Sequence, residues 1–152
     1  MIWKCRKWKR TGVAEEVTIR MEPEEVRELV LRIFDDLEAV GVVKRRGDEV
    51  AMNLAAIAAA AARGIDVSIS ARTYHRLKKE PTFNAAASLI TLGFIVMLEE
   101  AFNMPMKDPD PKYLLGLWLA SASMLRLMRE DSEGRKVYDR ILLLTKALQH
   151  MD

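Results

Sequence analysis

The side chains best suited to chemistry in this chain are cations, and they fall into three clusters. The first ten residues, MIWKCRKWKR, contain five Lys or Arg, two Trp and no acid. The second cluster is 44–46, and the third lies in ARTYHRLKKE, residues 71–80. Clustered cations bind the phosphates of a nucleic-acid backbone. The predicted nucleic-acid-binding residues are Lys4, Arg6, Lys7, Lys9, Arg10, Lys44, Arg45, Arg46, Arg72, Tyr74, His75, Arg76, Lys78 and Lys79.

The third cluster has the most informative spacing. Arg72, Arg76 and Lys79 recur at i, i+4 and i+7, which places them on one face of a helix. Leu77 lies on a neighbouring stripe that can face a core, and an exposed Tyr74 can stack on a base. A solvated surface helix accounts for the same residues nearly as well. Nucleic-acid binding therefore depends on whether folding brings the three clusters to one side of the molecule.

Catalytic and metal chemistry have no comparable support. Neither of the two histidines, His75 and His150, has a second His or Cys at metal-ligand spacing. Cys5 is the single cysteine, so the chain has no internal disulfide. The acidic pairs 35–36 and 99–100 are adjacent residues, whose side chains diverge by about 100° on a helix. Such pairs suit solvated faces better than acid–base dyads, so we expect no enzyme, no cofactor and no metal.

The N-terminal residues predict a small amount of β structure. Residues 13–21, VAEEVTIRM, alternate in the manner of a half-buried strand. The dipeptide Thr11-Gly12 can turn a hairpin that pairs this strand with residues 2–10. A two-residue turn gives the pairs Lys4 with Ile19, Arg6 with Val17, and Trp8 with Glu15. Because this pairing leaves neither face of 2–10 apolar, we expect an edge strand or a basic arm there.

The clearest helix covers residues 23–40. Pro23 suits the first turn, seven apolar side chains follow helical spacing, and Gly41 is a natural stop. The following sequence VVKRRGDEVAM, residues 42–52, predicts a short hairpin that turns near 46–48.

From residue 53 onward the pattern predicts successive helices. The first two are 54–63, between Asn53 and Gly64, and 71–80, between Ser70 and Pro81. The next three are roughly 83–103, 111–130 with Asp110 as its cap, and a last helix that begins at Ser132. In the last helix, Val137, Ile141, Leu144 and Leu148 form the expected buried stripe. The predicted fold is mainly α, a bundle of about five to six helices with a small N-terminal β-hairpin element. We expect a single domain, 1–152, with a mixed β/α segment at 1–52 and the helical bundle at 53–152.

Composition indicates a soluble cytoplasmic protein. Half of the residues are apolar and 30% are charged, with a net charge of +2. The basic start is followed by more charge, which is unlike a secretory signal. The uncharged stretch 81–98 begins with Pro and contains polar residues, so we interpret it as a buried central helix, with a membrane span as the alternative.

Charge is unevenly distributed along the chain. Residues 21–43 carry two Arg against seven acids, a net charge of −5. The acidic face of the helix at 23–40 can therefore meet a basic surface of another protein or of a neighbouring copy.

The third helix is also similar to part of a helix-turn-helix. SARTYHRL is similar to its second helix, and IAAAAARG to its first helix and turn glycine. Thr73 lies nine residues beyond Gly64, however, which is several more than the motif has. A helix-turn-helix-like DNA-binding regulator is therefore kept as an alternative function.

The helical succession at 53–150 and the clusters KCRKWKR, KRR and RTYHRLKK resemble, in plan, the small helical subunits of archaeal CRISPR interference complexes. Those subunits pack along the guide–target duplex and contact nucleic acid through basic surfaces. The resemblance implies a non-enzymatic subunit that binds RNA or single-stranded DNA inside a ribonucleoprotein, beside other subunits or copies of itself. The alternative is a structural protein–protein adaptor or coat subunit. No small-molecule substrate and no membrane partner are expected.

Overall fold

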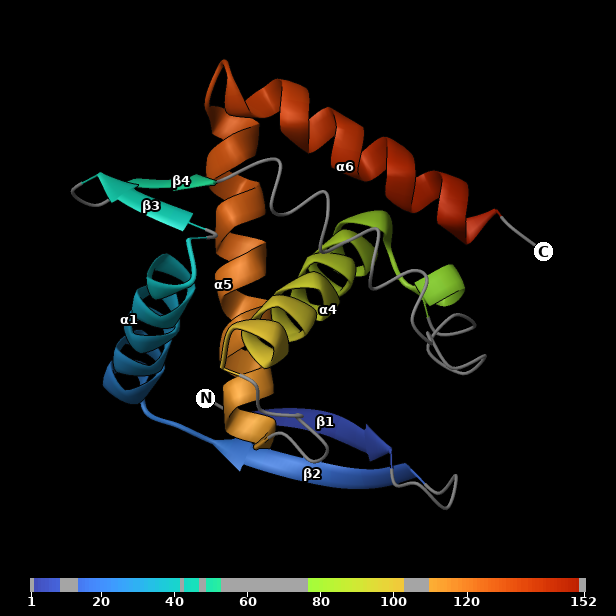
Figure 1. Ribbon diagram of the computed structural model, residues 1–152. Helices are drawn as coiled ribbons and strands as arrows, with labels where there is room; N and C mark the ends of the chain where they lie inside the picture. Colours follow the sequence, from blue (N-terminus) through green and yellow to red (C-terminus); the bar gives the residue numbers. More distant parts are fainter. Residues whose placement is uncertain are drawn as a thin grey trace.

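The computed structural model describes residues 2–8, 14–41, 43–46, 49–52, 77–102 and 110–150 (Figure 1). Its elements are β1 Ile2–Trp8, β2 Ala14–Arg20, α1 Pro23–Ala39, β3 Val43–Arg46, β4 Glu49–Met52, α4 Thr82–Phe102, α5 Pro111–Glu130 and α6 Gly134–Gln149. The fold is mainly helical, as predicted, with an antiparallel β-hairpin at its N-terminus. The predicted helix at 54–63, most of that at 71–80 and residues 103–109 lie outside the described residues.

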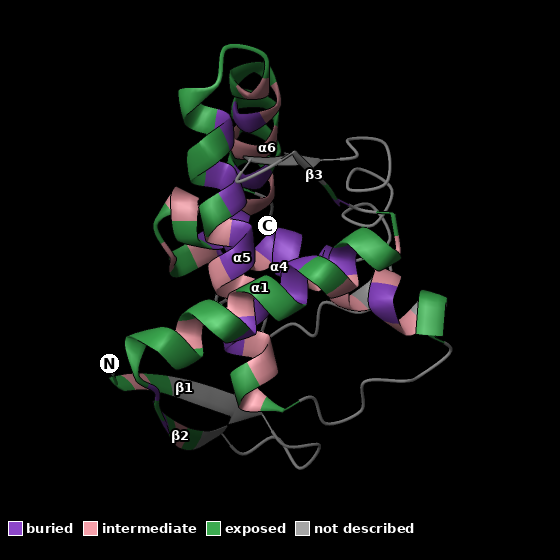
Figure 2. Cartoon of the chain, turned by 90° about the vertical axis from the view of Figure 1, so that its left-hand side faces the viewer, coloured by how far each residue is buried: buried purple, intermediate pink, exposed green. Residues whose placement is uncertain are grey.

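The predicted helix at 23–40 is confirmed as α1. Pro23 occupies its first turn, and the helix ends where Gly41 adopts a φ of +78°, a conformation that glycine reaches without strain. Its apolar stripe is buried, and Ile33 and Leu37 have no exposed area. The acidic side of α1 faces solvent, as the exposed residues along its outer face show (Figure 2).

Helix α5 holds the bundle together, because α1, α4 and α6 all pack against it (Figure 1). Asp110 caps it as predicted, accepting a hydrogen bond from the backbone N–H of Lys112. The largest fully buried side chains of the described core come from three helices: Ile33 and Leu37 of α1, Phe94 of α4, and Leu117, Ser121, Met124 and Leu125 of α5.

Small and polar residues let the helices approach closely. A Cβ on Gly116 of α5 would overlap Ile33 Cδ1 and lie 3.0 Å from Leu29 Cγ, so glycine permits the contact with α1. Between α4 and α5, Thr91 Oγ1 donates to Ala87 O at 2.7 Å and lies 3.2 Å from Ser121 Oγ. These buried hydroxyls are therefore satisfied within the core.

Helix α4 is the predicted apolar central helix. Its residues Thr82–Glu99 are long and apolar enough to cross a membrane by length and composition alone, and about half of them are buried inside the protein. Core helices of soluble proteins meet the same criteria, so this property is weak evidence for a span. Here α4 packs against both α5 and α6.

The predicted register of the N-terminal hairpin is wrong by one residue. β1 pairs with β2 so that Trp3 lies opposite Ile19, Cys5 opposite Val17 and Trp8 opposite Ala14. The described pairs run from Ile2 with Arg20 to Trp8 with Ala14, one residue out of register with the predicted two-residue turn. A one-residue shift exchanges the two faces of a strand. Trp3 therefore joins Val17 and Ile19 against the core, a contact that the predicted register did not allow.

The second predicted hairpin is confirmed, and the last predicted helix needs a small correction. Strands β3 and β4 form the expected hairpin, with Arg46 paired to Glu49. Helix α6 begins at Gly134, two residues after the predicted Ser132. Its buried residues are Tyr138 and Thr145, whereas Leu144 of the predicted stripe is 44% exposed. The apolar run Ile141–Leu144 is compatible with several helix faces, and packing against α4 and α5 selects one of them.

Candidate functional site

The described parts of the three basic clusters lie at three separate places. Figure 1 shows β1 near the N-terminal end of α5 and β3 beside the C-terminal part of α5. The short helical turn at 77–79 lies on the far side of α4. Segments that are separated in a projection are separated in space, so these described parts are not adjacent to one another. The other predicted contacts, Lys9, Arg10, Arg72, Tyr74, His75 and Arg76, lie outside the described residues.

The first cluster lies against acids of its own hairpin. Lys4 Nζ lies 3.8 Å from Glu16 Oε1, with both side chains largely exposed. The register also places Arg6 opposite Glu16 and Lys7 opposite Glu15. Exposed pairs of this kind contribute little to stability, but they reduce the local positive charge. Lys4 is thus less available to a phosphate than the composition of the strand suggests.

The described end of the third cluster is anchored by α6. Gln149 Nε2 donates to the backbone oxygens of Leu77 at 3.1 Å and Glu80 at 2.8 Å, and Gln149 Oε1 accepts from Thr82 Oγ1 at 3.3 Å. Leu77 is buried and Lys79 is exposed, in agreement with their predicted faces. Lys44 on β3 is exposed too.

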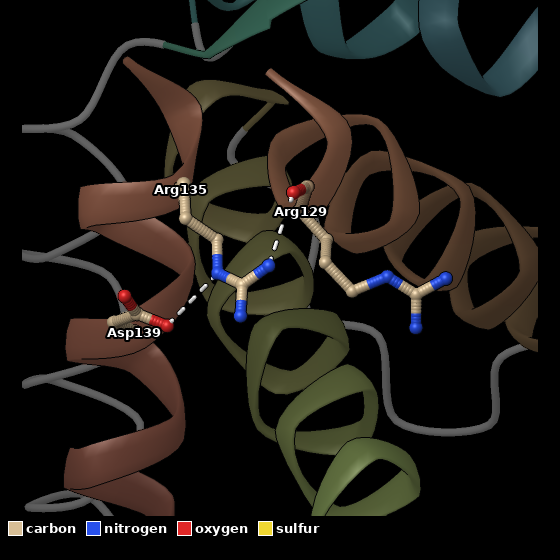
Figure 3. A network of polar contacts seen from close by, with 3 residues as sticks. All are labelled: Arg129, Arg135 and Asp139. Atoms are coloured by element: carbon tan, nitrogen blue, oxygen red, sulfur yellow. Dashed lines mark hydrogen bonds and ion pairs between the residues drawn. The ribbon is translucent and has the colours of Figure 1, made fainter. Parts of the chain in front are cut away.

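A further set of exposed cations on α5 and α6 was not predicted as a site. Its members are Arg126, Arg129, Arg135, Lys136, Arg140 and Lys146. Arg135 has a structural role, because its Nε donates to Asp139 Oδ1 at 3.2 Å and its Nη1 to Arg129 O at 3.4 Å. The guanidinium of Arg129 points away from this network (Figure 3).

The outer face of α6 combines cations with exposed apolar side chains. Lys136, Arg140, Leu143 and Ala147 are spaced i, i+4, i+7 and i+11, which places them on one stripe opposite buried Tyr138 and Thr145. Leu143 is 70% exposed, and Leu144 beside it is 44% exposed. We call these five residues, Lys136, Arg140, Leu143, Leu144 and Ala147, the α6 stripe. Its spacing was readable in the sequence, but its exposure was not.

An open groove of about 880 Å³ lies between α1, the end of α4 and the start of α5. Its apolar part consists of Met21, Leu29, Leu98 and Phe102, and Phe102 is 52% exposed. Its ionisable residues are Glu25, Glu28, Asp36 and Asp110 against Arg32 and Lys112, a net charge of −2. We call this site the acidic groove. Three elements distant in sequence form it, so the sequence predicted only the acidic face of α1.

A hydrogen bond between described residues crosses the acidic groove. Tyr113 Oη donates to Asp36 Oδ2 at 3.2 Å and so links α5 to α1. Burial, together with the Asp36 carboxylate, raises the pKa of Tyr113 to about 12. The phenol is therefore a neutral donor at physiological pH, which suits a binding or structural role rather than proton transfer. Asp36 is half-buried and partnered here, in contrast to the solvated carboxylate that the sequence predicted.

Within the described ranges, no three His, Cys, Asp or Glu side chains are grouped to hold a metal ion. The acidic groove can thus contribute charge, apolar surface and a hydrogen-bond donor. No family model, no curated protein and no solved structure matches the chain.

Proposed function

We propose that the protein is a non-enzymatic subunit of a larger assembly, which it joins through protein–protein contacts. The observation that carries this proposal is the segregation of charge beside exposed apolar side chains. Helix α1 has six acids and two Arg and borders the acidic groove, whereas α6 has four cations and one acid. Apolar centres with charged rims are typical of interfaces that select their partner.

Co-purification from the native cells tests this proposal. A tagged chain should recover a stoichiometric protein partner, with chemical cross-links that map to the acidic groove or the α6 stripe. The variant Glu25→Lys/Glu28→Lys should lose contacts at the groove. The matched control Glu24→Lys/Glu38→Lys makes the same charge change on α1 outside the groove and should retain them. Recovery of no protein partner by the wild-type chain would refute the proposal.

Nucleic-acid binding is the second candidate function. It is favoured by Lys44 and Lys79, which are exposed and continue two basic stretches of sequence. Binding of labelled RNA and single-stranded DNA across a salt series tests it, because phosphate contacts give a steep salt dependence. If the third cluster takes part, Arg72→Ala/Arg76→Ala should weaken binding about tenfold or more. A tenfold loss of affinity corresponds to roughly 1.4 kcal/mol of binding free energy. Absence of any shift at low salt would reject this function.

The two candidate functions are compatible within one ribonucleoprotein. A subunit like those of the archaeal CRISPR interference complexes would use protein contacts for position and cations for the bound strand. The helix-turn-helix alternative depends on residues 53–76, which lie outside the described residues, and stays a prediction.

A further inference from the structure

The acidic groove and the α6 stripe are complementary in chemistry. The groove has a net charge of −2 around an apolar centre that includes the half-exposed ring of Phe102. The α6 stripe has two cations, Lys136 and Arg140, followed by the exposed apolar side chains of Leu143 and Leu144. The two surfaces thus carry opposite charge, and both carry exposed apolar side chains that can pack against each other.

The two surfaces also match in length. On α1, Glu25, Glu28 and Asp36 form one flank of the acidic groove and span twelve residues, a separation of eleven helical steps. The α6 stripe, from Lys136 to Ala147, spans twelve residues and eleven steps as well. At a rise of about 1.5 Å per residue, both are roughly 16 Å long. A helix lying along the groove would place its cations and its leucines within the length of the acidic flank.

Their positions exclude contact within one molecule. Figure 1 shows α6 at the opposite side of the bundle from α1 and the N-terminal end of α5. The α6 stripe of one copy can therefore reach only the groove of another. Because the two surfaces differ, such a contact is heterologous and repeats from copy to copy unless a ring closes.

We infer that the acidic groove binds the α6 stripe of a second copy of this chain, so that copies associate head to tail. The inference rests on the proposed protein–protein function and names its partner. It leaves Lys44 and Lys79 outside the contact, since neither belongs to the groove or to the stripe.

Sedimentation of the purified full chain at low and high salt tests the inference. The wild-type chain should associate as its concentration rises, and association should weaken at 500 mM salt, where charges are strongly screened. Glu25→Lys/Glu28→Lys and Lys136→Glu/Arg140→Glu should each weaken association at least tenfold. An equimolar mixture of the two variants should associate again, because a reversed groove then meets a reversed stripe. The control Glu24→Lys/Glu38→Lys should behave as wild type.

An apolar variant provides an independent check. Leu143→Ser/Leu144→Ser changes two exposed side chains, so the circular dichroism spectrum and melting temperature should stay close to wild type while association is lost. A wild-type chain that stays monomeric at low salt would overturn the inference, as would a charge-reversed mixture that fails to associate. Either result would leave the proposed protein–protein function standing. Co-purification from the native cells would then test that function, with a different protein as the expected partner.

Discussion

Tyr113 shows how one side chain can report on the contact between α1 and α5. Its pKa is raised to about 12 by burial and by the Asp36 carboxylate, so the folded protein holds this proton more tightly than the unfolded chain does. The resulting stabilisation is complete below pH 10 and is lost as the pH rises from about 10 to 12. We expect the free energy of unfolding to fall across this range, measured by urea denaturation.

Variants at the same contact separate the causes of that shift. Tyr113→Phe should remove this part of the pH dependence, because no phenol then titrates. Asp36→Asn should lower the Tyr113 pKa but leave it above 10, because burial persists. The difference between the ultraviolet titrations of wild type and Tyr113→Phe isolates this tyrosine from the other two. A Tyr113 pKa of 10 in the wild-type protein would contradict the contact.

Gln149 is the second residue whose role depends on tertiary structure. Its side chain makes hydrogen bonds to the backbone at Leu77 and Glu80 and to Thr82, which joins the end of α6 to the start of α4. Gln149→Ala leaves two backbone carbonyls without this donor and should destabilise the protein by about 1–2 kcal/mol. The exposed neighbour variant His150→Ala should change stability by less than about 0.5 kcal/mol. Equal effects of the two variants in chemical denaturation would argue against this role.

At the scale of elements, the packing of α1 on α5 depends on a glycine. Gly116→Ala places a methyl group where Ile33 Cδ1 lies, and Ile33 is fully buried, so it has little room to move. We expect a destabilisation of about 1–3 kcal/mol, typical of overpacking. Ile33→Val removes the overlapping atom, so the double variant Gly116→Ala/Ile33→Val should lose less than the sum of the single variants. Strict additivity in the denaturation cycle would show that this overlap is not the cause.

The elements also show what the sequence can predict and what it cannot. Helix α1 was predictable because its apolar spacing, Pro23 and Gly41 all indicate the same element. The β1–β2 register was not, since it depends on the length of the connection between the strands, which the alternation does not specify. The exposed side of α6 depends on which face its neighbours cover. The acidic groove depends on three elements meeting, so no local pattern could predict it.

At the scale of the whole molecule, stability should be unevenly distributed. Helices α4 and α5 supply much of the buried core, whereas β1–β2 and β3–β4 are two separate two-stranded sheets. Isolated two-stranded sheets are marginal in water, and regions with few buried contacts open first. We therefore expect amide hydrogen exchange to be slowest in α4 and α5 and fastest in the two hairpins.

The same exchange experiment decides between the two interpretations of α4. If α4 is the core helix of this bundle, its amides are protected in plain buffer, because α5 and α6 cover it. Lipid vesicles should then leave that protection unchanged. The amides of a membrane-spanning α4 would show the opposite pattern. Its apolar side chains would be exposed to water in buffer and would be buried in hydrocarbon only after vesicles are added. Fast exchange of α4 in buffer, followed by protection when vesicles are added, would therefore contradict the bundle and the charged surfaces that it positions.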